Sequence, residues 1–295
     1  MPKNQQRKTP RSPSTSDPVS RYAKRVVAGK QVAGPLIRAA CQRHLRDLER
    51  RDWEYHFDRK RAQRAIDFFP DVLKLNGGEF EGKAFELQTW QQFIVGSVFG
   101  WTDSAGLRRF QVAYLEIGKG SGKSPLAAGI GLLMMVADGE SRAEVYAAAT
   151  KKDQAMILFR DAVAMVDLSP ELNSLLVRTG GQQHTWNMAH LESGSFFRAI
   201  SSDDGQSGPR PHCALVDEIH EHKSDDVVEM MRAGFKGRRQ PLMLMITNSG
   251  WDQTSVCWAQ HEYGERVVTD MHQEERYFAF VCSVDETDEV DGAAR

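Results

Sequence analysis

A glycine-rich segment near the middle of the chain has the residue types needed to hold an anionic ligand. It reads Gly-Lys-Gly-Ser-Gly-Lys-Ser over residues 118–124. Glycines let backbone N–H groups converge on an anion, and a helix that starts at the end of the loop adds a favourable dipole. We therefore predict a phosphate-binding loop, whose members are Gly118, Gly120, Ser121, Gly122, Lys123 and Ser124.

The last two residues of this loop would meet different parts of a bound nucleotide. In loops of this kind the lysine, here Lys123, neutralises the β- and γ-phosphates, and the hydroxyl of the next residue, here Ser124, ligates magnesium. The spacing is shorter than usual, because the usual pattern would place its first glycine at Ile117. The alternative is a Gly/Ser-rich turn in front of a buried helix. The predicted cofactors are ATP and Mg²⁺.

A second group of chemically suitable residues follows an apolar run about 95 residues later. Residues 213–216 are typical of a buried strand, and the run ends in Asp217 and Glu218. Phosphoanhydride hydrolysis needs one carboxylate to hold magnesium and a second to orient and polarise the attacking water. We assign Asp217 to the first role and Glu218 to the second, although such a pair can also cap a helix. His220 and His222 have no further ligand at suitable spacing, so we expect them to link the site to its surroundings.

These residues need a sheet that brings them to one edge. From Phe110 onwards, short apolar β-prone runs alternate with helix-length segments. The runs are apolar on both faces, which favours a mainly parallel, covered sheet whose strands present their carboxyl ends to one crevice. The expected fold is α/β, a P-loop NTPase of the RecA/ASCE type with flanking helices. The predicted strands are residues 112–117, 145–149, 196–200, 213–216, 242–247 and 277–281.

Composition divides the chain into four parts. Residues 1–20 are rich in Ser, Pro, Thr and basic residues, so we expect a disordered basic tail. Apolar residues at helical spacing predict a helical lead-in over 21–80, with one or two amphipathic helices within 34–69. The P-loop domain is expected over 81–283, starting with a buried helix within 87–101. Residues 284–295 are acidic and predict a linker.

The bulk composition is that of an ordinary soluble protein with an uneven distribution of charge. The 295 residues are 41% hydrophobic, which is enough for one substantial core, and carry a formal net charge of -2. Residues 1–64 contain 17 Lys and Arg against 6 Asp and Glu, so the basic part is N-terminal. The four cysteines form no Cys-x-x-Cys pair, which argues against a zinc site. The longest apolar run, 126–137, is too short to span a bilayer, so no membrane role is expected.

Several motifs in register resemble the ATPase half of large terminase subunits, the DNA-packaging motors of tailed double-stranded DNA phages. The similarity extends over roughly residues 65–285. Besides the phosphate loop, the motifs that carry it are Leu-Gln-Thr-Trp-Gln-Gln at 87–92, Ala-Ala-Ala-Thr-Lys-Lys-Asp-Gln-Ala at 147–155, Val-Asp-Glu-Ile-His-Glu-His at 216–222, Arg-Arg-Gln-Pro at 238–241 and Ile-Thr-Asn-Ser-Gly at 246–250.

The resemblance implies roles for four more residues. Gln91 matches the glutamine that reads the adenine edge, which suits an amide that both donates and accepts. Lys119 matches a basic residue early in the loop that stabilises transition-state charge. An arginine is more usual there, so a point charge replaces a planar fork. Thr247 and Asn248 match the motif that couples the state of the γ-phosphate to the grip on DNA, although Asn248 departs from the residues that the family usually has.

The same resemblance implies a motor that hydrolyses ATP while it moves double-stranded DNA into a procapsid. The implied partners are the portal protein and the small terminase subunit, and the motor would be a homo-oligomeric ring. It would act in the host cytoplasm at the portal and be absent from the mature virion. The nuclease domain of the family is expected to be missing, because the chain stops where the linker to it should begin.

Contact with DNA would be mostly with phosphates. The basic segment before residue 65 and the pair Lys151 and Lys152 are candidates for this contact. Arg238 or Arg239 could serve as a finger that reaches into a neighbouring subunit's site, in place of Lys119.

Two other functions fit part of the sequence. Asp-Glu-Ile-His at 217–220 resembles the DExH box of helicase-type translocases, but these need a second RecA-like domain. A binding-only nucleotide module with a degenerate site is the non-enzymatic alternative, because the loop spacing is short and Lys119 stands where an arginine is usual. Measured turnover of ATP separates these alternatives.

Overall fold

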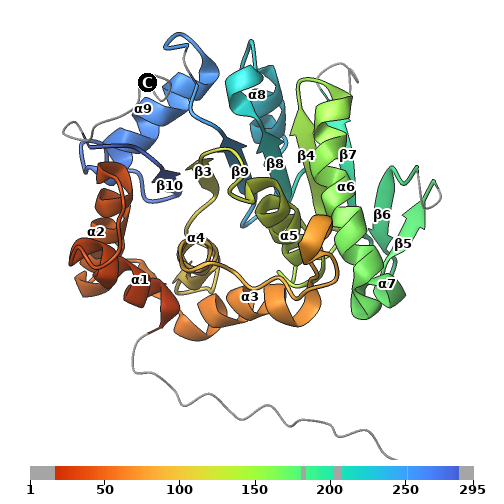
Figure 1. Ribbon diagram of the computed structural model, residues 1–295, viewed down its shortest axis with the longest axis horizontal. Helices are drawn as coiled ribbons and strands as arrows, with labels where there is room; N and C mark the ends of the chain where they lie inside the picture. Colours follow the sequence, from red (N-terminus) through yellow and green to blue (C-terminus); the bar gives the residue numbers. More distant parts are fainter. Residues whose placement is uncertain (1–16, 181–183, 202–207, 251, 286–295) are drawn as a thin grey trace, which may run out of the picture.

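One eight-stranded sheet forms the centre of the molecule (Figure 1). The computed structural model describes residues 17–180, 184–201, 208–250 and 252–285. The strands of this sheet are, in chain order, β3 (Val112–Glu116), β4 (Glu144–Ala149), β5 (Val177–Thr179), β6 (Asn187–His190), β7 (Ser195–Ser201), β8 (Cys213–Asp217), β9 (Leu242–Thr247) and β10 (Tyr277–Val281).

The strands lie in the order β10-β3-β9-β8-β4-β7-β6-β5. All pairs from β10 to β7 are parallel, and β6 and β5 continue the sheet in antiparallel fashion. The six predicted strands are all present and make up the parallel part, so the predicted α/β fold with a mainly parallel sheet is confirmed. β5 and β6 were not predicted, because they are short and mostly polar and carry no apolar run.

Helices cover both faces of the sheet, and two apolar clusters fill the space between the layers. One face carries α3 (Arg59–Val72), α4 (Thr89–Gly100), α5 (Lys123–Val136), α6 (Lys152–Leu168) and α7 (Pro170–Leu175). The other face carries α8 (Asp226–Ala233) and α9 (Val256–Val268). α1 (Pro18–Val27) and α2 (Pro35–Glu49) pack at the β10 side, and single 3-10 turns occur at Gly78–Phe80 (η1) and Ile219–Glu221 (η3).

α5 is the central helix and is buried on all sides. Its N-cap, Gly122, has φ 80°, a left-handed conformation that favours glycine. Two further glycines leave no room for a side chain. A Cβ at Gly129 would lie 2.5 Å from Phe69 of α3, and one at Gly131 would lie 2.8 Å from Leu215 of β8. These glycines let α5 fit between the lead-in and the sheet, which fixes where the phosphate loop begins.

The N-terminal part holds α1, α2 and α3, of which α2 and α3 occupy the range in which helices were expected. α1 begins at Pro18, inside the segment that was predicted as a tail, because Asp17 caps it by accepting a hydrogen bond from Ser20 N–H (2.7 Å). β1 (Tyr55–Phe57) pairs antiparallel with β2 (Trp101–Asp103), and neither strand was predicted. The rest of the predicted tail, 1–16, and most of the predicted linker, 286–295, lie outside the described residues.

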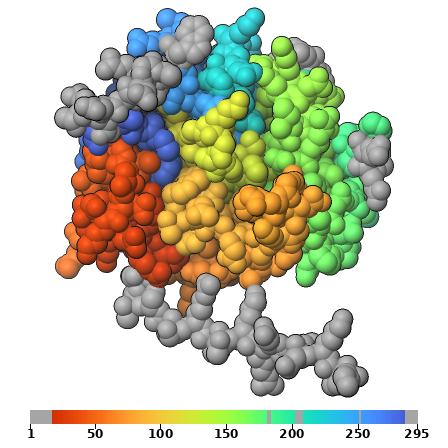
Figure 2. All heavy atoms as spheres, viewed as in Figure 1, coloured from red at the N-terminus to blue at the C-terminus, as the bar shows by residue number. Residues whose placement is uncertain are grey.

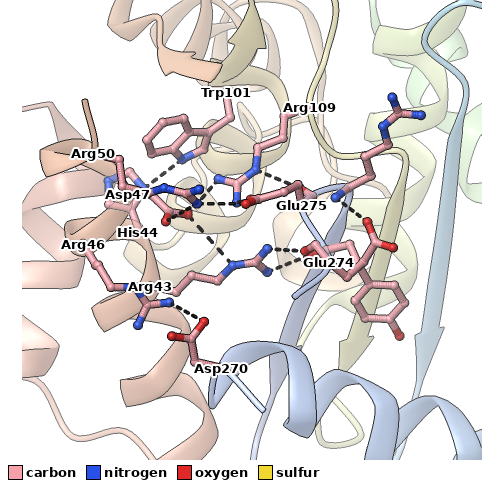
Figure 3. Close-up of polar contacts among 12 residues, drawn as sticks. Arg43, His44, Arg46, Asp47, Arg50, Trp101, Arg109, Asp270, Glu274 and Glu275 are labelled. Atoms are coloured by element: carbon pink, nitrogen blue, oxygen red, sulfur yellow. Dashed lines mark hydrogen bonds and ion pairs between the residues drawn. The ribbon is translucent and has the colours of Figure 1, made fainter. Parts of the chain in front are cut away.

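A buried polar cluster joins α2 to the amino ends of β3 and β10 (Figure 3). Arg109, which precedes β3, donates to Asp47 Oδ2 of α2 (2.8 Å) and to Glu275 Oε2 (2.7 Å). Arg43 of α2 donates to the backbone oxygen of Glu274 (2.5 Å). The arginines of this cluster are therefore neutralised within the chain.

His44 belongs to the same cluster and is uncharged. Trp101 Nε1–H donates to its Nδ1 (3.1 Å), its Nε2 lies 3.1 Å from Ser20 Oγ, and burial lowers its pKa to about 4. The cluster thus holds α1, α2 and the start of β2 together. In Figure 2 the α1–α2 part (red) and the α9–β10 part (blue) lie against each other on one side of the molecule.

A second buried cluster lies at the amino ends of β3, β8 and β9. Arg108 donates to Asp138 Oδ1 (2.9 Å) and to Gln240 O, and His212 Nε2 lies 2.7 Å from Asp138 Oδ2. The Arg108, Asp138 and His212 side chains are at most 2% exposed. Burial alone would raise the pKa of Asp138, but Arg108 and His212 bring it below its ordinary value. Charges at this edge of the sheet are compensated.

No helix in the described part of the chain combines the length and the apolar character that crossing a membrane requires.

Candidate nucleotide-binding site

The phosphate loop connects β3 to α5 at the carboxyl edge of the sheet. Ile117 N–H donates to Thr247 O of β9 (3.0 Å), which ties the start of the loop to the neighbouring strand. Inside the loop, Gly120 has φ 80° and the Ser121 hydroxyl donates to Gly118 O (2.7 Å). A Cβ at Gly118 or Gly120 would meet no atom within 4 Å. Glycine is therefore required at Gly120 by backbone conformation, and the loop is open to an approaching ligand.

Gln91 reaches the loop from the first turn of α4. It is buried, its Oε1 accepts a hydrogen bond from Gln88 N–H (2.8 Å), and its Nε2 lies 3.8 Å from the point where a Cβ of Gly122 would be. The structure thus places Gln91 against the phosphate loop, with its amide oxygen already engaged at the helix start. Reading of adenine by this amide stays a prediction.

Lys123, Asn248 and Glu218 come from three different elements and meet at the carboxyl edge. Lys123 Nζ, at the start of α5, donates to Asn248 Oδ1 (2.7 Å) and lies 3.6 Å from Glu218 Oε1. Asn248, directly after β9, donates through Nδ2 to Glu218 Oε2 (3.3 Å). The expected convergence of the loop and the acidic strand end on one crevice is therefore observed, with β9 between them.

Asp217 and Glu218 follow each other at the end of β8. The first has a shifted pKa, and the second has an uncommon backbone conformation. Burial, and then the neighbouring Glu218 carboxylate, raise the pKa of Asp217 to about 7. Glu218 has φ 48° and ψ 50°, a left-handed conformation that is uncommon for a residue with a side chain. Its N–H donates to Asp217 Oδ1 (2.8 Å). Strained residues of this kind cluster at functional sites.

Thr247 and the two histidines connect the strand ends. The Thr247 hydroxyl accepts a hydrogen bond from His220 N–H (3.1 Å) and donates to Asn248 O (2.8 Å). His222 Nε2 lies 3.0 Å from Asp217 O, and burial lowers the His222 pKa, so the neutral ring donates to that oxygen. The described residues contain no group of three or more side chains suited to hold a metal ion by themselves. Both histidines lie where they can link the site to its surroundings.

Two predicted site residues lie in the loop region without a contact that defines their role. Lys119 is exposed and makes no hydrogen bond or ion pair with the described residues. Ser124 is half-buried in the first turn of α5, next to Lys123. Both positions are compatible with contact to a bound nucleotide and its cation, and both roles stay predictions.

Arg238, one of the two candidates for a finger that reaches into a neighbouring subunit, has its contacts at the amino edge of the sheet, and the role of Arg238 or Arg239 as a finger stays a prediction. Arg238 donates to Glu140 Oε1 (3.0 Å) and to the backbone oxygens of Arg142 (2.9 Å) and Arg210 (3.0 Å). These partners lie near the amino ends of β4 and β8, at the edge away from the phosphate loop. Arg238 is engaged within its own chain, because the acidic residues around β4 neutralise it.

One residue beside the site was missed from the sequence. Glu116, the last residue of β3, is buried two positions before Gly118 and pairs with His261 of α9 (2.8 Å). The available signal was a carboxylate at the end of an otherwise apolar strand directly before a glycine loop. Its partner is 145 residues away in sequence, so the contact itself could not be foreseen.

Comparison with known proteins agrees with this geometry. A family model for the ATPase domain of the terminase large subunit matches residues 89–266. The large terminase subunit of Enterobacteria phage HK97 is 25% identical over 192 residues, 63% of this chain and 36% of that protein. The protein YmfN of Escherichia coli strain K12 is 32% identical over 102 residues, 35% of this chain and 22% of that protein.

The fold is also found in a solved terminase. The crystal structure of the HK97 bacteriophage large terminase matches with a TM-score of 0.64 at 20% identity, over 79% of this chain and 46% of that chain. The chain spans less than half the length of each of these relatives. The family model covers more than half of the chain and includes the acidic strand end and the residues that meet it. The chain belongs to the terminase large subunit family and contains the ATPase domain of that family.

Proposed function

We propose that this chain hydrolyses ATP to drive the packaging of double-stranded DNA into a procapsid. The observation that carries the proposal is the meeting of Lys123, Asn248 and Glu218 at one edge of the sheet, in a domain of the terminase ATPase family. These three side chains form a minimal hydrolytic site. The lysine can bind phosphates, the carboxylate can activate water, and the amide contacts both the lysine and the carboxylate.

In this site each side chain has a distinct task. The loop N–H groups and Lys123 bind the β- and γ-phosphates, which releases Lys123 from Asn248 and Glu218. Glu218 then accepts a proton from the attacking water and orients it toward the γ-phosphorus. The backbone of Glu218 is left-handed, and its carboxylate accepts a hydrogen bond from Asn248, which follows the neighbouring strand β9. The leaving ADP oxygen keeps its negative charge beside the loop.

Asp217 and Ser124 would hold a magnesium ion that accompanies the nucleotide. The residues fit such an ion, because burial, and then the adjacent Glu218 carboxylate, disfavour the charge on Asp217 and raise its pKa, and a cation beside Asp217 would offset both effects. Hydroxyl and carboxylate oxygens are the ligand types that magnesium prefers. When bound, the ion neutralises phosphate charge.

Lys119 and Gln91 complete the proposed nucleotide contacts. Lys119 is exposed on the loop and free to approach the γ-phosphate, where it would stabilise transition-state charge as a point charge. Gln91 would contact the adenine through the amide nitrogen that lies against Gly122. Thr247 and Asn248 would couple the phosphate state to DNA, since Asn248 touches both Lys123 and Glu218.

The finer partners belong to the proposal as well. DNA phosphates would meet exposed basic residues such as Lys24, Arg25 and Lys60, which make no ion pair with the described residues. Arg43, from the same basic segment, is buried in the α2 cluster, so it is not proposed to contact DNA. The working assembly would be a ring of this chain at the portal in the host cytoplasm, with the small terminase subunit as a further partner.

Turnover tests the proposal directly. We expect the purified chain to hydrolyse ATP in a magnesium-dependent way, faster with double-stranded DNA, and the Lys123→Ala variant to lose nucleotide binding. A Lys60→Ala variant should keep basal turnover and lose part of the stimulation by DNA. Nucleotide binding without hydrolysis above background, with or without DNA, would identify a binding-only module and overturn the motor function.

The role of Lys119 has its own test. Lys119→Ala should lower turnover by about 10³-fold or more with little change in ATP affinity, because fingers of this kind act on the transition state. Lys119→Arg should retain or raise turnover, since arginine is the more usual residue. A loss of affinity with unchanged turnover would show that Lys119 is only an electrostatic contact.

A further inference from the structure

Glu116 connects the phosphate loop to two elements that do not belong to it. It ends β3, two residues before Gly118, and is 4% exposed. Its backbone oxygen accepts a hydrogen bond from Cys282 N–H (2.8 Å) after β10. A charged side chain at this depth is expensive unless it is paired and hydrogen-bonded. The contacts of its carboxylate therefore show what it holds in place.

Two side chains hold the carboxylate. His261 Nδ1 of α9 donates to Oε2 (2.8 Å), and Tyr114 OH of β3 donates to the same oxygen (2.8 Å). Ser249 lines the same cavity as Glu116 and His261. Burial alone would raise the pKa of Glu116, but the bond from His261 and the others lower it, and the bond to Glu116 raises the pKa of His261. Both shifts favour the charged form of the group, so this contact favours an ion pair between Glu116 and His261.

Ser249 makes this ion pair relevant to the nucleotide site. It directly follows Asn248, the residue that contacts both Lys123 and Glu218. Glu116 is the register partner of Thr247, the residue before Asn248, so it lies beside the segment that carries Asn248. Through its own backbone it also sets the start of the phosphate loop. His261 adds the position of α9 to this arrangement.

The surroundings argue against a role in packing alone. A cavity of about 420 Å³ borders the pair and is lined by Glu116, Ser249, Gly250, Trp258, His261 and Cys282. The Trp258 ring stacks on His261 with 5.1 Å between centroids and 12° between planes, which holds the imidazole in orientation. Buried ion pairs add little net stability and are better attested as devices that specify one arrangement.

We propose that Glu116 is a positioning residue that fixes the distance between the phosphate loop and the segment 248–250, so that Asn248 can reach Lys123 and Glu218 together. This inference rests on the proposed ATPase function and extends it to a residue that does not itself touch nucleotide. Because His261 belongs to α9, a displacement of α9 would change the contact between His261 and Glu116.

A double-mutant cycle tests the proposal. Glu116→Gln keeps the shape and removes the charge, and we expect turnover to fall about tenfold or more with ATP affinity within about twofold, as for other side chains that orient an active group. Asn248→Ala should also lower turnover. If Glu116 acts through Asn248, the double variant should lose much less than the product of the two single losses.

Controls separate positioning from folding. Glu116→Asp keeps the charge and should restore part of the turnover that Glu116→Gln loses, and Glu192→Gln, an exposed carboxylate between β6 and β7, should leave turnover unchanged. Thermal unfolding of each variant gives the folded fraction. Multiplicative losses in the double variant, or a loss explained by the folded fraction alone, would overturn the positioning role while leaving the ATPase function intact. Absence of turnover in the unsubstituted chain would overturn both.

Discussion

Buried charge is compensated at the amino edge of the central sheet but not at the end of β8, on the carboxyl edge. At the amino edge, Arg108 is paired with Asp138 and Arg109 with Asp47, all with side chains that are at most 3% exposed. At the carboxyl edge, two carboxylates follow each other in Asp217 and Glu218, and the second sits in a left-handed backbone conformation. The pKa of Asp217 rises to about 7 through burial and the adjacent charge.

This difference distinguishes the charged residues that stabilise the fold from those that can act on a ligand. A compensated charge holds elements together and offers nothing to a ligand. An uncompensated or strained one costs free energy in the folded chain, and a ligand of opposite charge can recover part of that cost. Substitutions at the amino edge should therefore act on unfolding, and those at the carboxyl edge on turnover.

Among the substitutions that compare the two edges, Glu218→Gln should have the largest effect. The amide keeps the shape and the contact to Asn248 but cannot accept a proton from water, so turnover should fall by about 10² to 10⁴-fold. Nucleotide binding, measured by fluorescence titration, should be retained, and thermal unfolding should shift little. Turnover within twofold of the unsubstituted chain would remove Glu218 as the water activator.

At the opposite edge, Asp138→Asn should act on stability. It leaves the Arg108 guanidinium buried and uncompensated, which costs about 3–5 kcal/mol in free energy of unfolding by denaturant titration. Glu229→Gln is the matched control, because it breaks the exposed ion pair with Arg232, which is worth at most about 1 kcal/mol. Equal effects of the two substitutions would contradict the idea that the amino edge is where stability is stored.

His44 should give the amino edge a pH dependence. Its pKa in the folded chain is about 4, below the value of about 6.5 expected after unfolding. The unfolded chain therefore binds a proton first, and stability that is fully present above pH 6.5 is lost as the pH falls toward 4, by at most about 3 kcal/mol. His44→Asn should flatten this slope of unfolding free energy against pH, whereas the exposed His184→Asn should leave it unchanged.

The smallest expected effect has the opposite sign. Glu218→Gly removes the left-handed strain and the repulsion with Asp217, so we expect the free energy of unfolding to rise by about 1 kcal/mol while turnover is lost. Gly substitution is normally destabilising, which makes the sign informative. A decrease in stability would show that φ 48° at this position carries no strain.

The features that could be predicted from the sequence are those that depend on short continuous segments. The six parallel strands were predictable because each is apolar on both faces, and the glycine loop because its composition is rare. β5 and β6 escaped prediction because strands of three or four residues such as Val177–Thr179 carry little pattern. The left-handed conformation of Glu218 and the pair of Glu116 with His261 depend on tertiary contacts, so no window of sequence contains them.

The Arg108–Asp138 pair has a mechanical consequence. Arg108 lies just before β3 and Asp138 just after α5, the two elements on either side of the phosphate loop. The phosphate loop connects β3 and α5 at one end, and the ion pair connects them at the other. β3 and α5 are therefore joined at both ends, and the ion pair resists their separation when a ligand pulls on the loop.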